Sequence, residues 1–155
     1  MEQTFQTYKE KLFREIEEQC CKVVYSYTCH WKNAAFLKQD CSWFKWAQII
    51  LSAIATGGFI ATIVADQAKY AWIGGILSTI LLVINGYLKD KDFVAEQKMH
   101  RDTANKLWVI REEYIALLTD FDSLTEDKIV VKRDDLMKRT SKVYEIAPQT
   151  DKRSY

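Results

Sequence analysis

Two apolar stretches without a charged residue lie almost back to back in the middle of this chain of 155 residues. The first covers residues 46–65, the second covers residues 70–88, and only residues 66–69 separate them. A helix needs about 20 apolar residues to cross the hydrocarbon of a bilayer. Each stretch is therefore predicted to span a membrane. The disfavoured alternative is a buried helical hairpin in a soluble protein, because buried helices in so small a chain seldom run this far without a charge.

Basic residues near the ends of the two stretches predict how the hairpin is oriented. Several lysines and arginines precede the first stretch and follow the second, whereas the connecting turn carries only Lys69, which Asp66 offsets. The positive-inside rule then places both termini in the cytoplasm and the turn outside. We expect a multi-pass protein of the inner (cytoplasmic) membrane. Aromatic residues suited to the membrane–water interface flank the stretches: Trp43, Phe44, Trp46, Tyr70, Trp72 and Tyr87.

Helical periodicity continues through the polar flanks. Between residues 5 and 44, apolar residues recur every three or four positions with no Pro or Gly, and either Trp31 or Ala34 continues the stripe. We therefore expect an all-α membrane protein: one domain with a two-span transmembrane hairpin and long cytoplasmic helical extensions at both ends. Its expected parts are an amphipathic helix over 1–45, transmembrane helices over 46–65 and 70–88, a helix over 89–122 and a last helix over 125–147.

The second flank has three further local features. Residues 89–92 are charged but contain no helix breaker, so they are expected to continue the helix out of the membrane. Thr125 is a predicted N-cap of the last helix, which Pro148 ends, and residues 149–155 are expected to fray. From His100 onward, apolar steps alternate between four and three, which is typical of a coiled-coil-like seam. That seam consists of His100, Ala104, Leu107, Arg111, Tyr114, Leu118 and Phe121.

Small and polar residues inside the spans indicate how helices pack there. Small residues every fourth position let helix backbones approach closely in lipid, and the first span has such a row at Ala53, Gly57, Ala61 and Ala65. Polar side chains in a bilayer face other helices or water. For Asn85, an interhelical hydrogen bond and a pore lining both remain open. The candidates to line a pore are Gln48, Ser52, Thr56, Ser78, Leu82 and Asn85.

Two helices cannot enclose a channel, so any pore requires a homo-oligomer. A tetramer is the expected assembly, with one ring of helices around its axis. The short turn cannot supply a re-entrant selectivity filter, so the expected conductance is poorly selective.

The last helix carries an excess of positive charge. Three interpretations remain open for its basic side chains: binding of a phosphate ligand, attraction to anionic lipid headgroups, and a solvated helix face. Duplex DNA is not an expected partner. The ligand-binding candidates are Lys128, Lys132, Arg133, Lys138, Arg139 and Lys142.

Neither catalysis nor a metal centre is predicted. Both spans lack Asp, Glu, His and Cys, and no nucleophile or metal-ligand spacing occurs outside them. Cys20, Cys29 and His30 fit no common zinc pattern, and the cysteines are better explained as small helix-packing residues. We therefore expect no enzymatic activity, no cofactor and no metal.

Four segments, in order, carry a resemblance that covers nearly the whole chain. They are Ala34-Ala35 with Lys38 before the first span, the exit-helix residues Ala104, Leu107, Arg111, Tyr114, Leu117 and Leu118, then Arg133-Asp134-Asp135-Leu136, and last Tyr144-Glu145-Ile146-Ala147-Pro148. This arrangement resembles the SLATT family, the two-span effector domains found beside nucleotide-signalling enzymes in bacterial anti-phage systems.

The resemblance implies a pore-forming or membrane-disrupting effector of abortive infection. Its gating signal would be a nucleotide or short oligonucleotide made by a partner nucleotidyltransferase. The alternative is a non-conducting, membrane-anchored scaffold whose cytoplasmic helices dock another protein.

Overall fold

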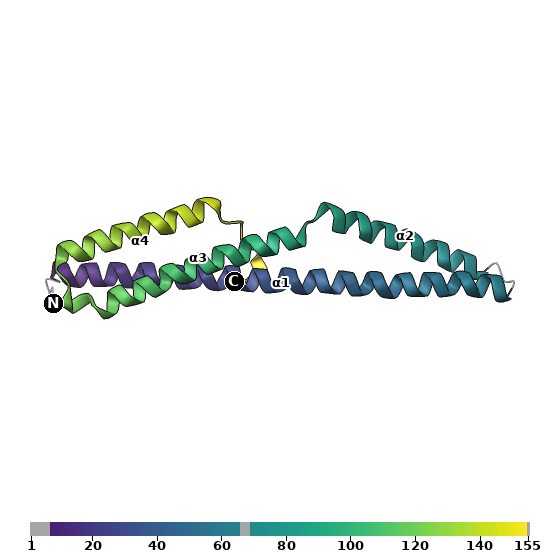
Figure 1. The fold of residues 1–155 in the computed structure, drawn as a ribbon, viewed down its shortest axis with the longest axis horizontal. Helices are drawn as coiled ribbons and strands as arrows, with labels where there is room; N and C mark the ends of the chain where they lie inside the picture. The colour runs from purple at the N-terminus through teal and green to yellow at the C-terminus, as the bar shows by residue number, and fades with distance from the viewer. Residues whose placement is uncertain (1–6, 66–68, 155) are drawn as a thin grey trace, which may run out of the picture. The chain divides into compact units, whose positions relative to one another are not determined.

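The structure, a computed structural model, describes residues 7–65 and 69–154, apart from the side chains of residues 61–65, 69 and 70. Over this described part the chain is helical and contains no β-strand, which confirms the all-α prediction. The elements are α1 (Tyr8–Ala65), α2 (Lys69–Asp90), α3 (Phe93–Thr119), a short 3-10 helix η1 (Phe121–Ser123), α4 (Glu126–Ile146) and a second one, η2 (Lys152–Ser154) (Figure 1).

The chain divides into two compact units, and α1 runs through both. The three-helix unit comprises Met1–Ala34 and Lys98–Tyr155, and the hairpin unit comprises Ala35–Gln97. α1 runs without interruption from Tyr8 to Ala65, so it joins the helix predicted before the first apolar stretch to the helix predicted within it.

The three-helix unit is built around one apolar core between the first part of α1, α3 and α4 (Figure 1). The buried core residues recur three or four positions apart in α1 and α3 and seven positions apart in α4, so each helix places one stripe in the core. Fully burying a side chain of this size contributes about 1.5–3 kcal/mol. The buried core residues are Leu12, Ile16, Cys20, Val23, Leu107, Ile110, Tyr114, Leu117, Phe121, Ile129, Leu136 and Val143.

Part of the predicted stripe of α1 differs from the structure at its ends. Ala34 is buried, whereas Trp31 is 50% exposed, so Ala34 is the residue that continues the stripe. Tyr8, which lies four positions before Leu12 in the periodic pattern, is exposed, because it is in the first turn of the helix, beyond Leu12, the first buried residue of α1. Phe5 lies outside the described residues.

The seam predicted on α3 is confirmed at most positions. His100, Ala104 and Leu107 are buried, as are Tyr114 and Phe121. At the two remaining steps, the neighbouring Ile110 and Leu117 are buried instead of Arg111 and Leu118. At the first of these steps Ile110 takes the core position, and Arg111 lies at the edge of the core, where its guanidinium group stays hydrated.

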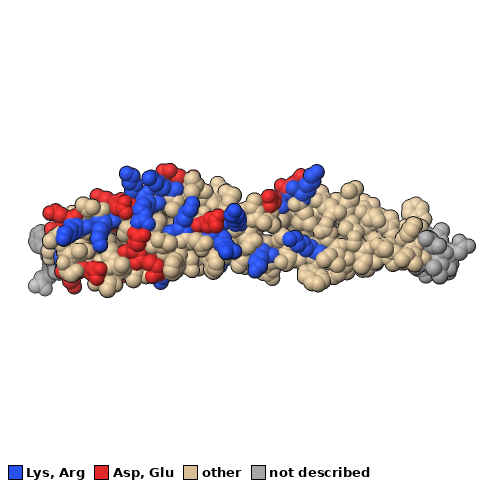
Figure 2. Space-filling model, in the orientation of Figure 1, with Lys and Arg blue, Asp and Glu red and all other residues tan. Residues whose placement is uncertain are grey.

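In the hairpin unit, α2 packs on the second part of α1 through a narrow seam of half-buried residues, and most other apolar side chains point outward. Leu82 is 71% exposed and Trp72 is 77% exposed. Among the described residues, one helix, within Ala71–Thr119, is long and apolar enough to cross a membrane, and 0% of its apolar window is buried. A core helix of a soluble protein would be largely buried. The surface over most of α2 carries no charged side chain (Figure 2).

The prediction of a continuous helix through residues 89–92 is wrong. α2 ends at Asp90 and α3 begins at Phe93. The Asp92 carboxylate accepts a hydrogen bond from the backbone N–H of Ala95 (2.9 Å), as an N-cap does. Phe93 is buried against the rings of Phe44 and Tyr87, whose centroids lie 5.8 and 6.2 Å from its own. Capping by Asp92 and burial of Phe93 together stabilise the break more than the backbone hydrogen bonds of a continuous helix would.

The prediction that residues 149–155 fray is also wrong for the described residues up to 154. Ser154 is 1% exposed, and its hydroxyl donates to the backbone carbonyl of Asp151 (2.6 Å), the residue before η2. The segment therefore packs on the three-helix unit.

The backbone of Thr125 is extended at the predicted N-cap of α4, although its side chain makes no capping hydrogen bond.

Replacing Asp92 by Ala should destabilise the start of α3 by about 1 kcal/mol, because the N–H of Ala95 loses its acceptor. Hydrogen exchange of the amides of residues 93–96 measures this as faster exchange. Asp90→Ala, which removes the same charge two residues earlier, is the control and should leave those amides unchanged. If hydrogen exchange accelerates equally in both variants, the negative charge, and not the capping hydrogen bond, stabilises the start of α3.

Candidate functional site

The four lysines of α4 form one exposed face, which we call the lysine face: Lys128, Lys132, Lys138 and Lys142. At 100° per residue they fall within an arc of about 120° on the helix. The buried stripe of α4 lies on a neighbouring side, with Ile129 and Leu136 in the core. Basic side chains are visible along α4 in the view of Figure 2, interspersed with acidic ones.

The two arginines predicted to share this role are held in ion pairs. Arg133 donates to Glu15 of α1 (3.0 Å) and to Asp134 (2.8 Å). Arg139 makes a bidentate contact with Glu113 of α3 (2.5 and 2.6 Å). The hydrogen bond from Arg139 lowers the pKa of the Glu113 carboxyl. These arginines therefore tie α4 to its two neighbours.

The lysines differ from the arginines in this respect. In the described parts of the chain, no acidic side chain forms an ion pair with any lysine of the lysine face. Exposed Val131 (69%) and Ile146 (63%) lie on the same side of the helix. Unpaired cations beside exposed apolar groups suit an amphiphilic or a phosphorylated ligand.

A buried histidine pair lies between α1 and α3. The Nδ1 atoms of His30 and His100 are 2.9 Å apart, and the side chains are 3% and 1% exposed. One Nδ1 must donate and the other accept, so at least the accepting ring is neutral in this contact. Burial, and then the proximity of His100, lower the pKa of His30 to about 4. Sequence reasoning missed this pair, although the position of His100 on the predicted seam was a signal that it faces a neighbouring helix.

A cavity of about 500 Å³ opens beside this pair, between α1 on one side and the end of α4 with the segment that follows it on the other. Tyr25, Cys29 and His30 line it from α1, and Tyr144 and Pro148 line it from the C-terminal side. The predicted Tyr-Glu-Ile-Ala-Pro ending therefore forms one wall of a cavity.

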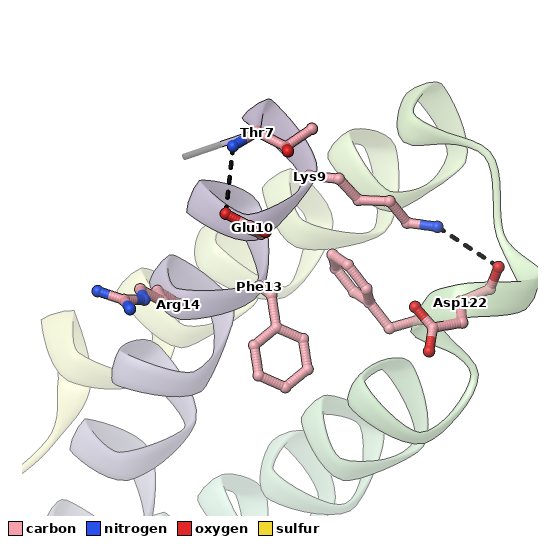
Figure 3. Close-up of a pocket in the computed structure, with 7 residues that line it drawn as sticks. Thr7, Lys9, Glu10, Phe13, Arg14 and Asp122 are labelled. Carbon is pink, nitrogen blue, oxygen red and sulfur yellow. Dashed lines mark hydrogen bonds between the residues drawn. The ribbon is translucent and has the colours of Figure 1, made fainter. Parts of the chain in front are cut away.

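A second cavity, of about 400 Å³, lies where the start of α1 meets η1 (Figure 3). Its polar groups are engaged within the chain. Lys9 donates to the carbonyl of Asp122 (3.4 Å), and Glu10 accepts from the backbone N–H of Thr7 (3.2 Å). The rings of Phe13 and Phe121 pack edge to face, with centroids 5.2 Å apart. These contacts close the end of the three-helix unit.

Among the pore-lining candidates, Gln48 and Asn85 are brought together. The Gln48 amide donates to the Asn85 side-chain oxygen, which links α1 to α2. This contact favours the interhelical hydrogen bond for Asn85. The Thr56 hydroxyl donates to the carbonyl of Ser52 (2.9 Å) in its own helix. Ser78 and Leu82 are exposed on α2.

The small-residue row does not pack against α2 where it is described. A Cβ placed on Gly57 would meet nothing within 4 Å, and Ala53 is exposed. The side chains of Ala61 and Ala65 lie outside the described residues. The row is therefore available to another helix.

The cysteines and histidines form no cluster of three or more candidate metal ligands within the described residues. Cys20 and Cys29 are buried and unbridged, and burial raises the pKa of the Cys20 thiol.

Lowering the pH from 7 to 5 should reduce the free energy of unfolding of the three-helix unit by about 2 kcal/mol. The pKa of His30 is depressed in the folded chain, so the unfolded chain binds the proton more tightly over this range. Stability is thus present above the ordinary histidine pKa and is lost as the pH falls toward 4. Chemical denaturation of the detergent-solubilised chain at both pH values measures the change.

His30→Gln is the matched variant, because it keeps a polar side chain but cannot titrate. It should lose most of the pH dependence between pH 7 and 5. An unchanged dependence in the variant would assign the effect to another group.

Comparison with protein families gave a match over residues 12–155 to the model described as SMODS and SLOG-associating 2TM effector domain family 4. Comparison with curated proteins and with solved structures gave no significant match.

Proposed function

Since the chain belongs to the SMODS and SLOG-associating 2TM effector domain (SLATT) family, we propose that it is a membrane-permeabilising anti-phage effector controlled by a nucleotide signal. The family consists of effector domains and is not a known enzyme family. Membership of the chain in this family supports an anti-phage role in a membrane. By their name, these domains associate with nucleotidyltransferases of the SMODS kind, which fits a nucleotide made by a partner enzyme.

The observation that carries the membrane part of the proposal is the exposed surface of the two uncharged apolar stretches in the hairpin unit. Its large apolar side chains have no cover within the described chain, and lipid supplies that cover. In the proposed topology, residues 46–65 and 70–88 cross the inner membrane and both termini lie in the cytoplasm. The three-helix unit then lies on the side where a nucleotide is synthesised.

Assembly into a pore is supported by the small-residue row on α1. Ala53 and Gly57 face away from α2, so the row can seat a helix of a second copy. A tetramer would place four such contacts around an axis. Without a re-entrant segment the opening would discriminate poorly between ions, which suits depolarisation of an infected cell.

Replacing Gly57 by Leu should abolish assembly and the release of a dye from liposomes, because the added side chain separates the backbones at the row. Native mass measurement in nanodiscs and dye release measure the two effects. Gly75→Leu is the control, since it adds the same volume at another open glycine, on α2. Undiminished release by Gly57→Leu would show that the row does not organise the active state.

The signal is proposed to bind the lysine face. Because these lysines lack ion-pair partners in the described structure, their charge is available to phosphates, whereas Arg133 and Arg139 are committed to carboxylates. A test should therefore change the lysines and leave both arginines in place.

Changing all four lysines of the lysine face to Gln should weaken binding of an oligonucleotide and flatten its salt dependence. The log–log slope should fall by about 0.7 for each phosphate that the variant no longer neutralises. Titration of cyclic and linear oligonucleotides in neutral-lipid nanodiscs measures this without competition from anionic lipid. The control changes Lys11, Lys22, Lys32 and Lys106, which lie on other helices of the same unit, to Gln. Equal weakening in both variants would assign binding to overall charge.

A non-conducting scaffold remains the second candidate, because exposed Trp108 and Val109 on α3 offer an apolar surface to a partner protein. Dye release from liposomes that contain the purified chain, with and without candidate oligonucleotides, separates the two functions. A scaffold would release no dye under either condition.

A further inference from the structure

A third cavity, of about 420 Å³, lies in the hairpin unit at the end remote from the connecting turn. α1, α2 and the first residues of α3 all contribute to it. Lys45 comes from α1, Lys89 from the last turn of α2, and Lys91 from the break between α2 and α3. Leu88 and Val94 give its wall an apolar part.

The charges of this cavity do not balance. Its one acidic residue, Asp92, already caps α3 through the hydrogen bond from Ala95. Over the described chain, Lys45 and Lys89 have no carboxylate within ion-pair distance. The Lys91 ammonium lies 5.1 Å from the centre of the Phe93 ring, an exposed contact that an anion would readily outcompete. Three lysines thus line a cavity with one engaged carboxylate.

The position of the cavity along the chain identifies the anion. Lys45 directly precedes the first apolar stretch, and Leu88 is the last residue of the second. In the proposed topology this is the cytoplasmic edge of the hydrocarbon, which agrees with exposed Trp43 and Trp46 at the same level of α1. Phospholipid phosphates lie at this depth, and basic pockets between membrane helices on the cytoplasmic side bind such headgroups.

We propose that this cavity binds the phosphate of an anionic phospholipid of the inner leaflet, with Lys45, Lys89 and Lys91 donating to its oxygens. The acyl chains would run along the exposed apolar surface of the residues of α2 that precede Leu88. The proposal rests on the membrane-spanning topology of the proposed function. It favours a lipid over a soluble phosphate because the cavity wall is partly apolar and the hydrocarbon begins beside it. A bound headgroup would link the ends of both spans to the start of α3.

The test uses the full chain in nanodiscs made from equal amounts of phosphatidylcholine and phosphatidylglycerol. Native mass spectrometry after release from the disc counts the lipids that each subunit retains. The unmodified chain should retain phosphatidylglycerol with a several-fold preference. The triple variant K45Q/K89Q/K91Q should retain the two lipids near their mixing ratio, and K45R/K89R/K91R should keep the preference.

The matched control is K32Q/K38Q/K98Q, which removes the same charge from lysines outside the cavity and should keep the preference. Equal loss in both Gln variants, or no preference in the unmodified chain, would overturn the proposal. Displacement of the lipid by millimolar inorganic phosphate would overturn its assignment to a phospholipid. A chain that fails to enter the discs at all would refute the membrane topology itself, which is a different result from entry without lipid preference.

Discussion

The apolar exterior of the hairpin unit is the constraint on which the rest of the molecule depends. No part of the described chain covers this surface, and its exposure to water would carry a large free-energy cost. Polar groups in this unit accordingly find partners within it: Gln48 pairs with Asn85, and Thr56 and Thr79 donate to carbonyls one turn earlier in their own helices. Such internal pairing is what a medium without water requires.

The three-helix unit satisfies its charges by a different rule. Arginines that connect helices are paired with carboxylates, and lysines on the outer side of α4 are not, within the described residues. This separation divides the basic residues of one helix into structural and available groups. Arg and Lys are suited to these roles, because the planar guanidinium fits a carboxylate with two hydrogen bonds and the ammonium remains a mobile point charge.

Periodicity and composition predicted most of the fold, because both arise from local spacing. The 3-and-4 pattern of α3 and the long course of α1 follow directly from where apolar residues recur. The break at residues 89–92 did not follow, since it depends on Asp92 capping and on Phe93 meeting Phe44 and Tyr87, two rings that come from other helices. The order of the C-terminal segment likewise depends on packing against the unit, which a polar sequence does not reveal.

The candidate binding site on α4 was predicted less completely, because it too depends on contacts between helices. A basic helix is visible in a sequence, but its division into paired arginines and unpaired lysines requires knowing that Glu15 and Glu113 lie opposite. The histidine pair joins residues 70 positions apart, and no local pattern predicts that contact.

The absence of charge from residues 46–65 and 70–88 has an electrical consequence. A membrane potential acts on a protein by moving charged side chains through its field, at about 2.3 kcal/mol for each elementary charge per 100 mV. These two segments contain no side-chain charge for such a field to move. A pore of the proposed kind would therefore receive no feedback, through side-chain charges in these segments, from the voltage that it dissipates: the collapse of the potential would neither hasten nor arrest its opening.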